Sequence, residues 1–340
     1  MSSIQTFQSS KKRVGFVDLS KGFCICLVVL LHVFGETAGE TFDMLNLFRM
    51  PLYFILSGMF FKRYGGFLDF FKKKTNKLLI PFLITYLLTC IPSIFVLSSR
   101  PLSLSSFWNE ESYKVNLGCN GAAWFLLCLF FQNILFYLIY KASDNVIVVS
   151  SVSIVTGLVG YAMNVYGCHL PLWIDTAMTA LPFFLFGYAL RKYSEVLYCK
   201  MNGMYMAITA LALFVLMAVN HYNHVMGTTV LSYGDNAFNM NVVCLYFGGI
   251  SGFWIVFMLS KCLNYLPVFS YVGRYSIVVL LTHLLYLLLI RNVLFKMGID
   301  QSMLGVNVMV FFVIIFLSLP TIRFCIKYLP YWFAQKDLIK

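Results

Sequence analysis

Three ionisable side chains in the first apolar segment of the sequence have types that suit proton transfer or anion binding. Asp18, Lys21 and His32 fall within an arc of about 60° when the segment is drawn as an α-helix. A charged side chain inside a bilayer costs about 2.5–3.5 kcal/mol on insertion scales, so each requires a partner or a function. Lys21 and His32 are about 16 Å apart along the helix axis, which predicts one near each membrane face. We expect the opposite face to contact lipid through Leu19, Phe23, Leu27 and Leu30.

Each of these side chains has an ordinary structural explanation beside the chemical one. Asp18 and Lys21, three residues apart, are equally consistent with an ion pair that anchors the helix at the inner interface. A buried histidine often does no more than hydrogen-bond a neighbouring helix. Because an imidazole titrates near neutral pH, His32 is nevertheless the candidate general base.

Arg49 is the second candidate for chemistry at membrane depth. It lies in the sequence Phe48-Arg49-Met50-Pro51, which we expect to open the second helix with Pro51 in the first turn, where its missing N–H costs little. This places Arg49 at about the depth of His32. The guanidinium then either extends outward to water or points inward, where it binds an anion or stabilises a developing oxyanion.

Three further side chains complete the candidate site. Ser276 and His283 are seven residues apart in the ninth apolar segment, so a helix presents both on one face. Trp124 opens the fourth segment, where a tryptophan is most often part of the interfacial aromatic belt. Two histidines and one arginine at similar depth predict a polar cavity in the outer half of the membrane.

Membrane-spanning helices must position these side chains, because the composition excludes a soluble domain. Hydrophobic residues make up 60% of the chain and charged residues only 11%, whereas soluble domains are about 25% charged. The apolar runs are long enough for the roughly 20 residues of a spanning helix and lack the alternation of a barrel strand. They predict an all-α, polytopic membrane bundle of about ten helices. The expected spans are 14–34, 44–62, 78–98, 122–141, 146–166, 172–190, 203–220, 240–260, 270–290 and 305–328.

The distribution of positive charge predicts that both termini are cytoplasmic. With the N-terminus inside, all but five of the 25 lysine and arginine residues lie on the cytoplasmic side, as the positive-inside rule requires. The exceptions are Arg49, Arg100, Lys114, Arg291 and Lys296. The net charge of +12 therefore reflects orientation, and no nucleic-acid partner is expected. We expect a multi-pass protein of the inner (plasma) membrane that has lipids as partners.

No composition shift divides the chain, so residues 1–340 are interpreted as one membrane domain with a disordered tail at 1–12. The basic stretch 62–77 is predicted to lie along the inner surface. Two outer loops, 99–121 and 221–239, are long enough to fold over a site.

Metal and disulfide chemistry have weak support. His221, His224 and Asp235 make a metal site conceivable, but a solvated loop is favoured and no metal is predicted. Most of the ten cysteines lie in apolar segments, where they act as small hydrophobic residues. Cys119 and Cys168 occupy outer loops on the same side and could pair.

These motifs together resemble the acyltransferase-three family of bacterial membrane acyltransferases, which includes fucose 4-O-acetylase-like proteins. Ten residues separate Lys21 from His32, and with Arg13 and Asp18 before them they resemble the family's basic-x10-His signature. The second match is Phe48-Arg49-Met50-Pro51-Leu52-Tyr53-Phe54-Ile55-Leu56-Ser57-Gly58. Weaker matches are Ala123-Trp124-Phe125-Leu126 and Gly273-Arg274-Tyr275-Ser276 with His283. Many fucose-acetylase-like members resemble Phe-His-Met-Pro where this chain has Arg49, so no imidazole role is transferred to that position.

The resemblance implies a ten-helix O-acyltransferase that moves an acyl group, usually acetyl from acetyl-CoA, to a hydroxyl of a cell-surface or lipid-linked sugar. His32 would be the base, and Arg49 the oxyanion stabiliser or an anchor for CoA phosphate. Lysines 72–74 and 77 would attract those phosphates. The side chains implied in binding donor or substrate are Asp18, Lys21, Trp124, Ser276 and His283. Acetyl-CoA would be a co-substrate, the acceptor a carbohydrate or lipid-linked glycan, and no bound cofactor is expected.

A transporter or flippase for a lipid-linked sugar is the alternative. Such a protein would carry charged residues in several helices and show repeat symmetry. No repeat is visible, and most of the third to eighth segments lack charge, which favours one compact site.

Overall fold

The computed structural model describes residues 14–35, 39–97, 104–109, 113–199, 201–228 and 231–339. The expected N-terminal tail and Arg13 of the first motif lie outside these residues. The α-helices are α1 (Gly15–Phe34), α2 (Gly39–Met59), α3 (Phe67–Lys74), α4 (Ile80–Thr85), α5 (Ile91–Leu97), α6 (Leu104–Phe107), α7 (Trp124–Ala142), α8 (Val146–Val165), α9 (Ile174–Thr179), α10 (Leu181–Tyr193), α11 (Gly203–Val225), α12 (Val242–Leu263), α13 (Pro267–Arg274), α14 (Ser276–Lys296) and α15 (Leu304–Tyr328). Short 3-10 turns cover Gly121–Ala123 and Pro171–Trp173, and the strands are β1 (Trp108–Asn109), β2 (Lys114–Val115), β3 (Leu231–Ser232) and β4 (Ala237–Phe238).

The prediction of a polytopic helical membrane protein is confirmed. Among the described residues, eight helical spans are long and apolar enough to cross a membrane. The pair α9 and α10, bent by 53°, gives a ninth if it is one broken span. Helix α2 has 21 residues but is more polar, because it carries Asp43, Asn46 and Arg49. With α2 counted, the helices correspond in order to the ten predicted spans.

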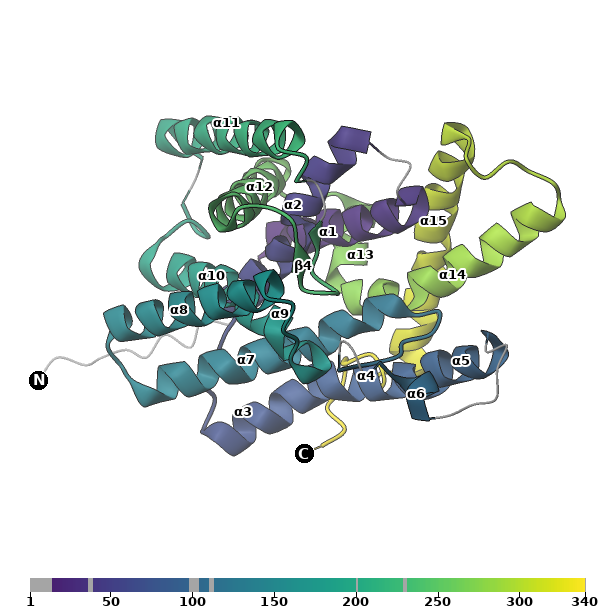
Figure 1. Cartoon of the computed structure of the whole chain (residues 1–340), viewed down its shortest axis with the longest axis horizontal. Coiled ribbons are helices and arrows are strands. Elements are labelled where there is room, and N and C mark those ends of the chain that lie inside the picture. The colour runs from purple at the N-terminus through teal and green to yellow at the C-terminus, as the bar shows by residue number, and fades with distance from the viewer. Residues whose placement is uncertain are drawn as a thin grey trace, which may run out of the picture.

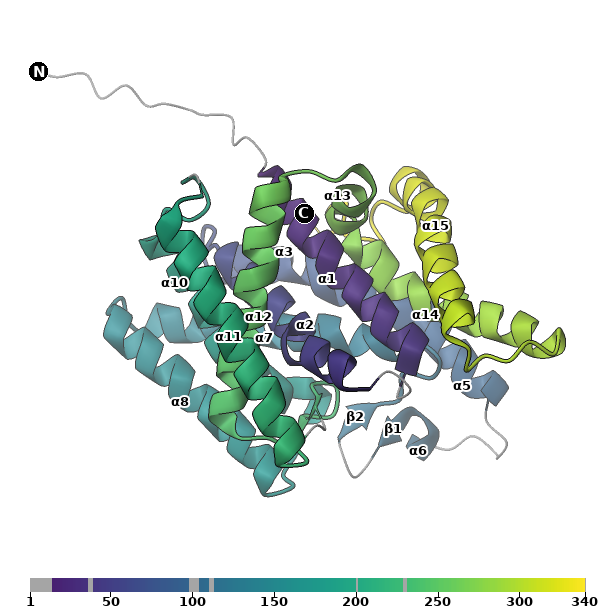
Figure 2. The same cartoon turned by 90° about the horizontal axis from the view of Figure 1, so that it is seen from above.

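Helix α1 runs through the middle of the bundle, with α11 and α12 on one side and α14 and α15 on the other (Figure 2). It contacts α2, α12, α13, α14 and α15. The prediction of a lipid-facing side was wrong for Leu19, which is fully buried, while Phe23, Leu27 and Leu30 are partly buried. An amphipathic pattern indicates which side is polar, but here neighbouring helices cover both sides.

Helix α2 begins earlier than predicted. It starts at Gly39, so Pro51 lies inside the helix and not in its first turn. A proline there cannot donate to the carbonyl four residues before it, that of Leu47. The residues added before Met44 are largely polar, and for this reason the predicted span, 44–62, did not include them.

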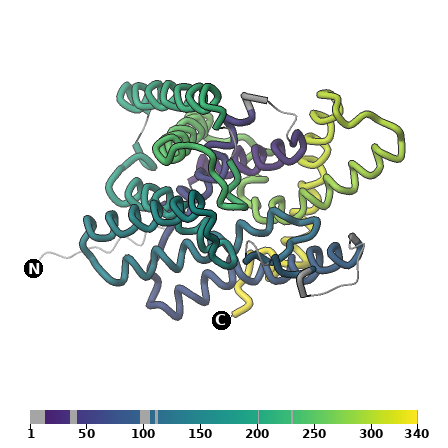
Figure 3. Tube along the Cα trace, viewed as in Figure 1, coloured from purple at the N-terminus to yellow at the C-terminus, as the bar shows by residue number. Residues whose placement is uncertain are grey.

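Two prolines accompany breaks in the regular α-helical hydrogen bonding of the third span. It runs from α3 through α5, interrupted by π-helical turns at Thr75–Leu79 and Tyr86–Cys90. Each π turn ends two residues before a proline, Pro81 or Pro92, where a regular backbone hydrogen bond cannot form. The stretch predicted to lie along the inner surface thus continues into the span as α3, which packs beside α7 (Figure 3).

Glycines set the closest helix contacts. A Cβ on Gly22 or Gly273 would come within about 2 Å of the facing backbone, because α1 and α13 pack directly on one another. The same holds for Gly58 of α2 and Gly187 of α10, whose Cβ positions would meet the carbonyls of Phe184 and Ile55 at 1.9 Å. Small residues allow this approach, as in many membrane bundles.

The two ends of the bundle differ in chemistry. The basic end holds Lys21 of α1 and Arg191 of α10, which both lie against the ring of Phe60 just after α2 (these helices are labelled in Figure 1). At the opposite end, called here the cavity end, the antiparallel hairpins β1–β2 and β3–β4 lie over the helix termini. The two outer loops predicted to fold over a site contain these hairpins.

Candidate active site

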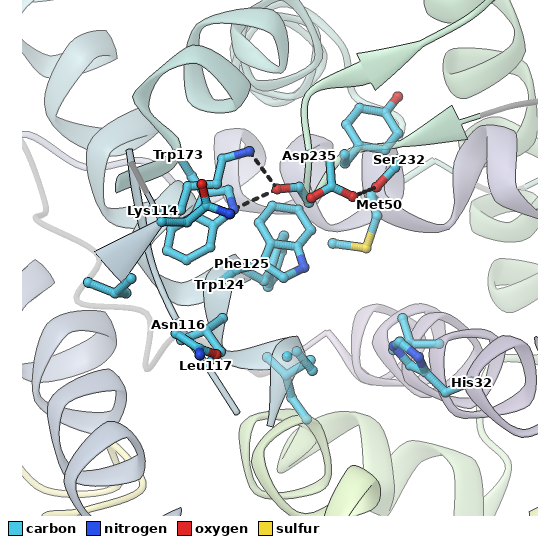
Figure 4. A pocket seen from close by; sticks show the side chains of 18 of the residues that line it. His32, Met50, Lys114, Asn116, Leu117, Trp124, Phe125, Trp173, Ser232 and Asp235 are labelled. Atoms are coloured by element: carbon cyan, nitrogen blue, oxygen red, sulfur yellow. Dashed lines mark hydrogen bonds between the residues drawn. The ribbon is translucent and has the colours of Figure 1, made fainter. Parts of the chain in front are cut away.

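A cavity of about 920 Å³ occupies the cavity end of the bundle. Both hairpins, the start of α7 and the facing sides of α1 and α2 form its wall (Figure 4). Its lining includes His32, Arg49, Lys114, Trp108, Trp124, Trp173, Tyr233 and Asp235. Of the residues predicted from sequence, His32, Arg49 and Trp124 therefore share one wall.

His32 occupies the last turn of α1, and its side chain opens into the cavity. The helix ends at Gly35, whose φ of 58° and ψ of −144° are accessible to glycine but rare for other residues. Arg291 of α14 donates to the Val33 carbonyl at 2.7 Å and to the Asn307 side chain at 2.5 Å. This arginine satisfies a carbonyl in the last turn and fixes the helix end that carries His32.

Arg49 is half-buried and faces the cavity from α2. Its backbone carbonyl accepts a hydrogen bond from the Cys24 thiol at 2.9 Å, which holds this part of α2 against α1. The guanidinium is within electrostatic range of the Tyr233 phenol, which belongs to the hairpin above. A planar cation with several N–H donors at a cavity wall can bind an anion or a polarised carbonyl oxygen.

His283 lies directly behind His32. Its side chain is 0% exposed, and the two imidazole centroids are 5.2 Å apart with an angle of 43° between the ring planes. The Nδ1 atom of His283 lies 2.9 Å from the Val279 carbonyl, one turn earlier in α14. The two predicted histidines thus lie side by side although they belong to different helices, α1 and α14.

The two hairpins meet over the cavity at one carbonyl. Lys114 Nζ and Trp173 Nε1 both donate to the carbonyl of Gly234, at 3.1 and 2.6 Å (Figure 4). Trp173 reaches this position from a backbone with φ of 64°, and the preceding Leu172 has φ of 57°. Such angles cost energy in residues that are not glycine, and neighbouring contacts must maintain them.

Lys114 and Asp235 bring opposite charges to the cavity wall. Burial lowers the pKa of Lys114, while the carboxylates of Asp175 and Asp235 act in the opposite direction. Asp235 accepts a hydrogen bond from the Ser232 hydroxyl at 2.8 Å, which orders the hairpin turn. The cavity therefore holds both hydrogen-bond donors and acceptors beside its aromatic walls.

Tyr233 fixes the second hairpin to the bundle. Its carbonyl accepts from the Thr176 hydroxyl at 2.9 Å, and its ring packs against Phe54 and Phe238. The side chain is 3% exposed, and its hydroxyl has no hydrogen-bond partner among the described residues. Burial raises the pKa of Tyr233, so the phenol stays protonated at neutral pH.

A comparison with known families identifies the family of the chain. The model of the family described as "acyltransferase domain" (acyltransferase-three) matches residues 14–323, nearly the whole chain. The chain belongs to the acyltransferase-three family. It is therefore a membrane acyltransferase, as its sequence motifs predicted, and the transporter alternative finds no support. No curated protein and no solved structure matched the chain.

Three of the predicted site residues of this acyltransferase lie away from the cavity. Asp18 and Lys21 belong to the basic end of α1, where the Lys21 ammonium lies 5.5 Å from the centre of the Phe60 ring. Ser276 begins α14, about two turns before His283, and is a near neighbour of the Tyr53 hydroxyl. Their predicted roles in binding remain predictions, and any such role would be exercised outside this cavity.

The basic cluster of α3 is partly engaged by the end of the chain. Asp337 pairs with Lys73 and Lys77, and Lys77 also donates to the Ala334 carbonyl. Asn76 accepts from two backbone N–H groups of the same segment, those of Leu338 and Ile339. These lysines hold the C-terminal segment in place, which weakens the expectation that they attract a phosphate.

The possible disulfide and the conceivable metal site did not form in the described structure. Cys119 and Cys168 are both free thiols. His224 faces Asp43 at 3.7 Å, whereas Asp235 belongs to the cavity wall.

Sequence reasoning missed Lys114, Trp173, Tyr233 and Asp235 as members of the site. Trp173 lies outside the two outer loops, at the start of the sixth expected span, and gave no signal. For the other three residues the signal present in the sequence was the length of those two loops. Their individual residues gave none, because a lysine or an aspartate in a solvated loop is ordinary. Only the folded hairpins show which loop side chains turn toward His32.

Proposed function

We propose that this acyltransferase moves an acetyl group from acetyl-CoA to a hydroxyl of a cell-surface or lipid-linked glycan. The observation that carries the proposal is the shared cavity of His32 and Arg49, walled by three tryptophans. It supplies a base, a cation and a surface suited to a sugar within one space.

The chemistry follows from the two predicted catalytic side chains. A ring nitrogen of His32 takes the proton of the acceptor hydroxyl as its oxygen attacks the thioester carbonyl carbon. Arg49 stabilises the negative charge that develops on the carbonyl oxygen. When the tetrahedral intermediate collapses, the C–S bond breaks and the imidazolium returns the proton to the CoA sulfur. The products are the O-acetyl ester and CoA thiol, and His32 is neutral again.

The cavity wall supports a sugar as the acceptor. Trp108, Trp124 and Trp173 offer flat apolar surfaces on which the C–H face of a pyranose ring can lie. Asn116 and Asp235 place an amide and a carboxylate beside them, which suits the hydroxyl groups at the ring edge. A purely apolar acceptor would desolvate the remaining hydrogen-bonding capacity of these polar groups without replacing the lost water contacts.

The basic end supports an approach of the donor from the opposite side. Lys21 and Arg191 both lie against the ring of Phe60, at 5.5 and 5.7 Å. Two cations on one aromatic side chain suit a phosphorylated molecule. In this proposal the thioester arm extends from that end toward His32, over the roughly 16 Å that the helix geometry gives.

The test removes the base and leaves the fold intact. His32→Ala should abolish glycan O-acetylation, seen by mass spectrometry as loss of the mass increment of one acetyl group. The variant should still insert and elute as a monodisperse species in detergent, because His32 lines the cavity and its side chain is exposed. As a matched control, His221→Ala, an exposed histidine of α11, should acetylate normally. Normal acetylation by the His32 variant would refute the proposal.

A further inference from the structure

The hydrogen bonding of His283 determines which tautomer of its neutral ring is present. A carbonyl oxygen only accepts hydrogen bonds, so the 2.9 Å contact with Val279 requires the proton on Nδ1. In the neutral ring Nε2 is then an acceptor. This Nε2 has no hydrogen-bond partner among the described residues although the side chain is completely buried. A buried acceptor without a donor costs about 1–3 kcal/mol, so its retention in the bundle interior calls for a function.

The missing donor is within reach. The centroids of His32 and His283 are 5.2 Å apart. An imidazole nitrogen lies a little over 1 Å from its ring centre, so facing nitrogens at this separation would be about 3 Å apart, an ordinary hydrogen-bond length. His32 can turn to make this bond because its side chain opens into the cavity, whereas packing and Val279 fix His283.

We propose that His283 is a positioning residue that sets the tautomer of His32. One ring nitrogen of His32 donates its proton to Nε2 of His283. The other nitrogen is then unprotonated and directed into the cavity, which is the form a general base requires. The inference rests on the proposed function of His32, and it assigns His283 no contact with the substrate.

In this arrangement His32 is the base and His283 only fixes its tautomer. A neutral imidazole alone populates both tautomers, and a flexible one spends much of its time with the wrong nitrogen toward the substrate. An acceptor on one side removes that ambiguity, as carboxylates and carbonyls do for other catalytic or metal-binding histidines. Here a second histidine serves as acceptor without placing a negative charge at membrane depth.

Nitrogen NMR of the histidines tests the tautomer directly. The chain has five histidines, so uniform ¹⁵N-histidine labelling gives a spectrum that single substitutions can assign. At about pH 8 an unperturbed imidazole is neutral and its two nitrogens have distinct shifts in each tautomer. In the purified full-length protein His32 should show one tautomer. In His283→Asn, which retains an amide near the Nδ1 position but has none at Nε2, His32 should show a mixture.

The glutamine variant is the matched rescue. Its amide oxygen reaches the position of Nε2, so His283→Gln should restore the single His32 tautomer. Activity should follow the same order with acetyl-CoA and the glycan fraction that the wild type modifies. We expect kcat of His283→Asn to fall about tenfold or more with KM within about threefold, and His283→Gln to remain within about threefold of wild type.

The outcomes separate this inference from the proposed function. An unchanged single tautomer of His32 in His283→Asn, or equal activities of the asparagine and glutamine variants, would overturn the positioning role. Full activity of His32→Ala would overturn the proposed function while leaving the NMR result intact. His221→Asn controls for the loss of an imidazole elsewhere and should change neither measurement.

Discussion

At the scale of single residues, two of the buried polar atoms that have no hydrogen-bond partner among the described residues lie around the cavity. The Tyr233 hydroxyl and the His283 Nε2 atom both lie in its surroundings, each buried and each without a partner among the described residues. Buried polar groups in folded proteins are nearly always hydrogen-bonded. Both atoms therefore point to a role in the function of the site more than in the stability of the fold.

Replacing Tyr233 with phenylalanine should separate these two roles. The substitution removes only an unpaired hydroxyl, so the free energy of unfolding should stay within about 1 kcal/mol of wild type or rise slightly. If the phenol binds acceptor or donor, kcat/KM should fall about tenfold, because the free energy of one hydrogen bond in a desolvated site corresponds to a factor of about ten. Thermal unfolding in detergent and steady-state kinetics check the two parts. A large loss of stability with unchanged kinetics would contradict the expectation.

The sequence predicted the site residues that are unusual for their segment. His32 and Arg49 stood out because titratable groups in apolar helices are costly, and both line the cavity. Lys114 and Tyr233 did not stand out, because their types are common in loops and their burial depends on how the hairpins fold. Asp18 and Lys21 share a helix face with His32, but the rise of the helix predicted them near the opposite membrane face, and they do lie at the other end of α1.

At the scale of elements, the position of the site depends on glycine contacts between helices. Gly187→Ala should test this at the contact of α10 with α2, the helix that carries Arg49. The new Cβ would come within 1.9 Å of the Ile55 carbonyl, and backbone cannot move aside as a flexible side chain can. We expect a loss of about 1–3 kcal/mol, seen as a lower unfolding temperature in detergent.

Gly305→Ala in α15 is the matched control for that substitution. No atom lies within 4 Å of the position where its Cβ would be. Alanine there should be neutral or stabilise the helix by about 0.5–1 kcal/mol. Equal unfolding temperatures of the two variants would show that the close approach of α2 and α10 is unimportant.

The elements themselves were predictable where apolar runs are long and uniform. The order of the ten segments matches the structure, but their limits do not where polar residues extend a helix, as before Met44 in α2. The break at Tyr275 between α13 and α14 was missed, because Gly273 and Ser276 are compatible with a continuous membrane helix. Two-residue strands such as those of the hairpins leave no periodic signal.

At the scale of the whole molecule, the orientation predicted from charge can be tested with cysteines that the chain already has. Cys168, in the loop after α8, and Cys262, at the basic end of α12, are both exposed free thiols. If the basic end is cytoplasmic, a membrane-impermeant maleimide should label Cys168 in right-side-out vesicles and Cys262 only in inside-out vesicles. Cys168→Ser and Cys262→Ser identify each signal.

A cytoplasmic basic end places the cavity on the outer face, where a surface glycan could enter, and makes acetyl-CoA approach from the other side. Labelling of Cys262 in sealed right-side-out vesicles would reverse the orientation and require the acceptor to be cytoplasmic.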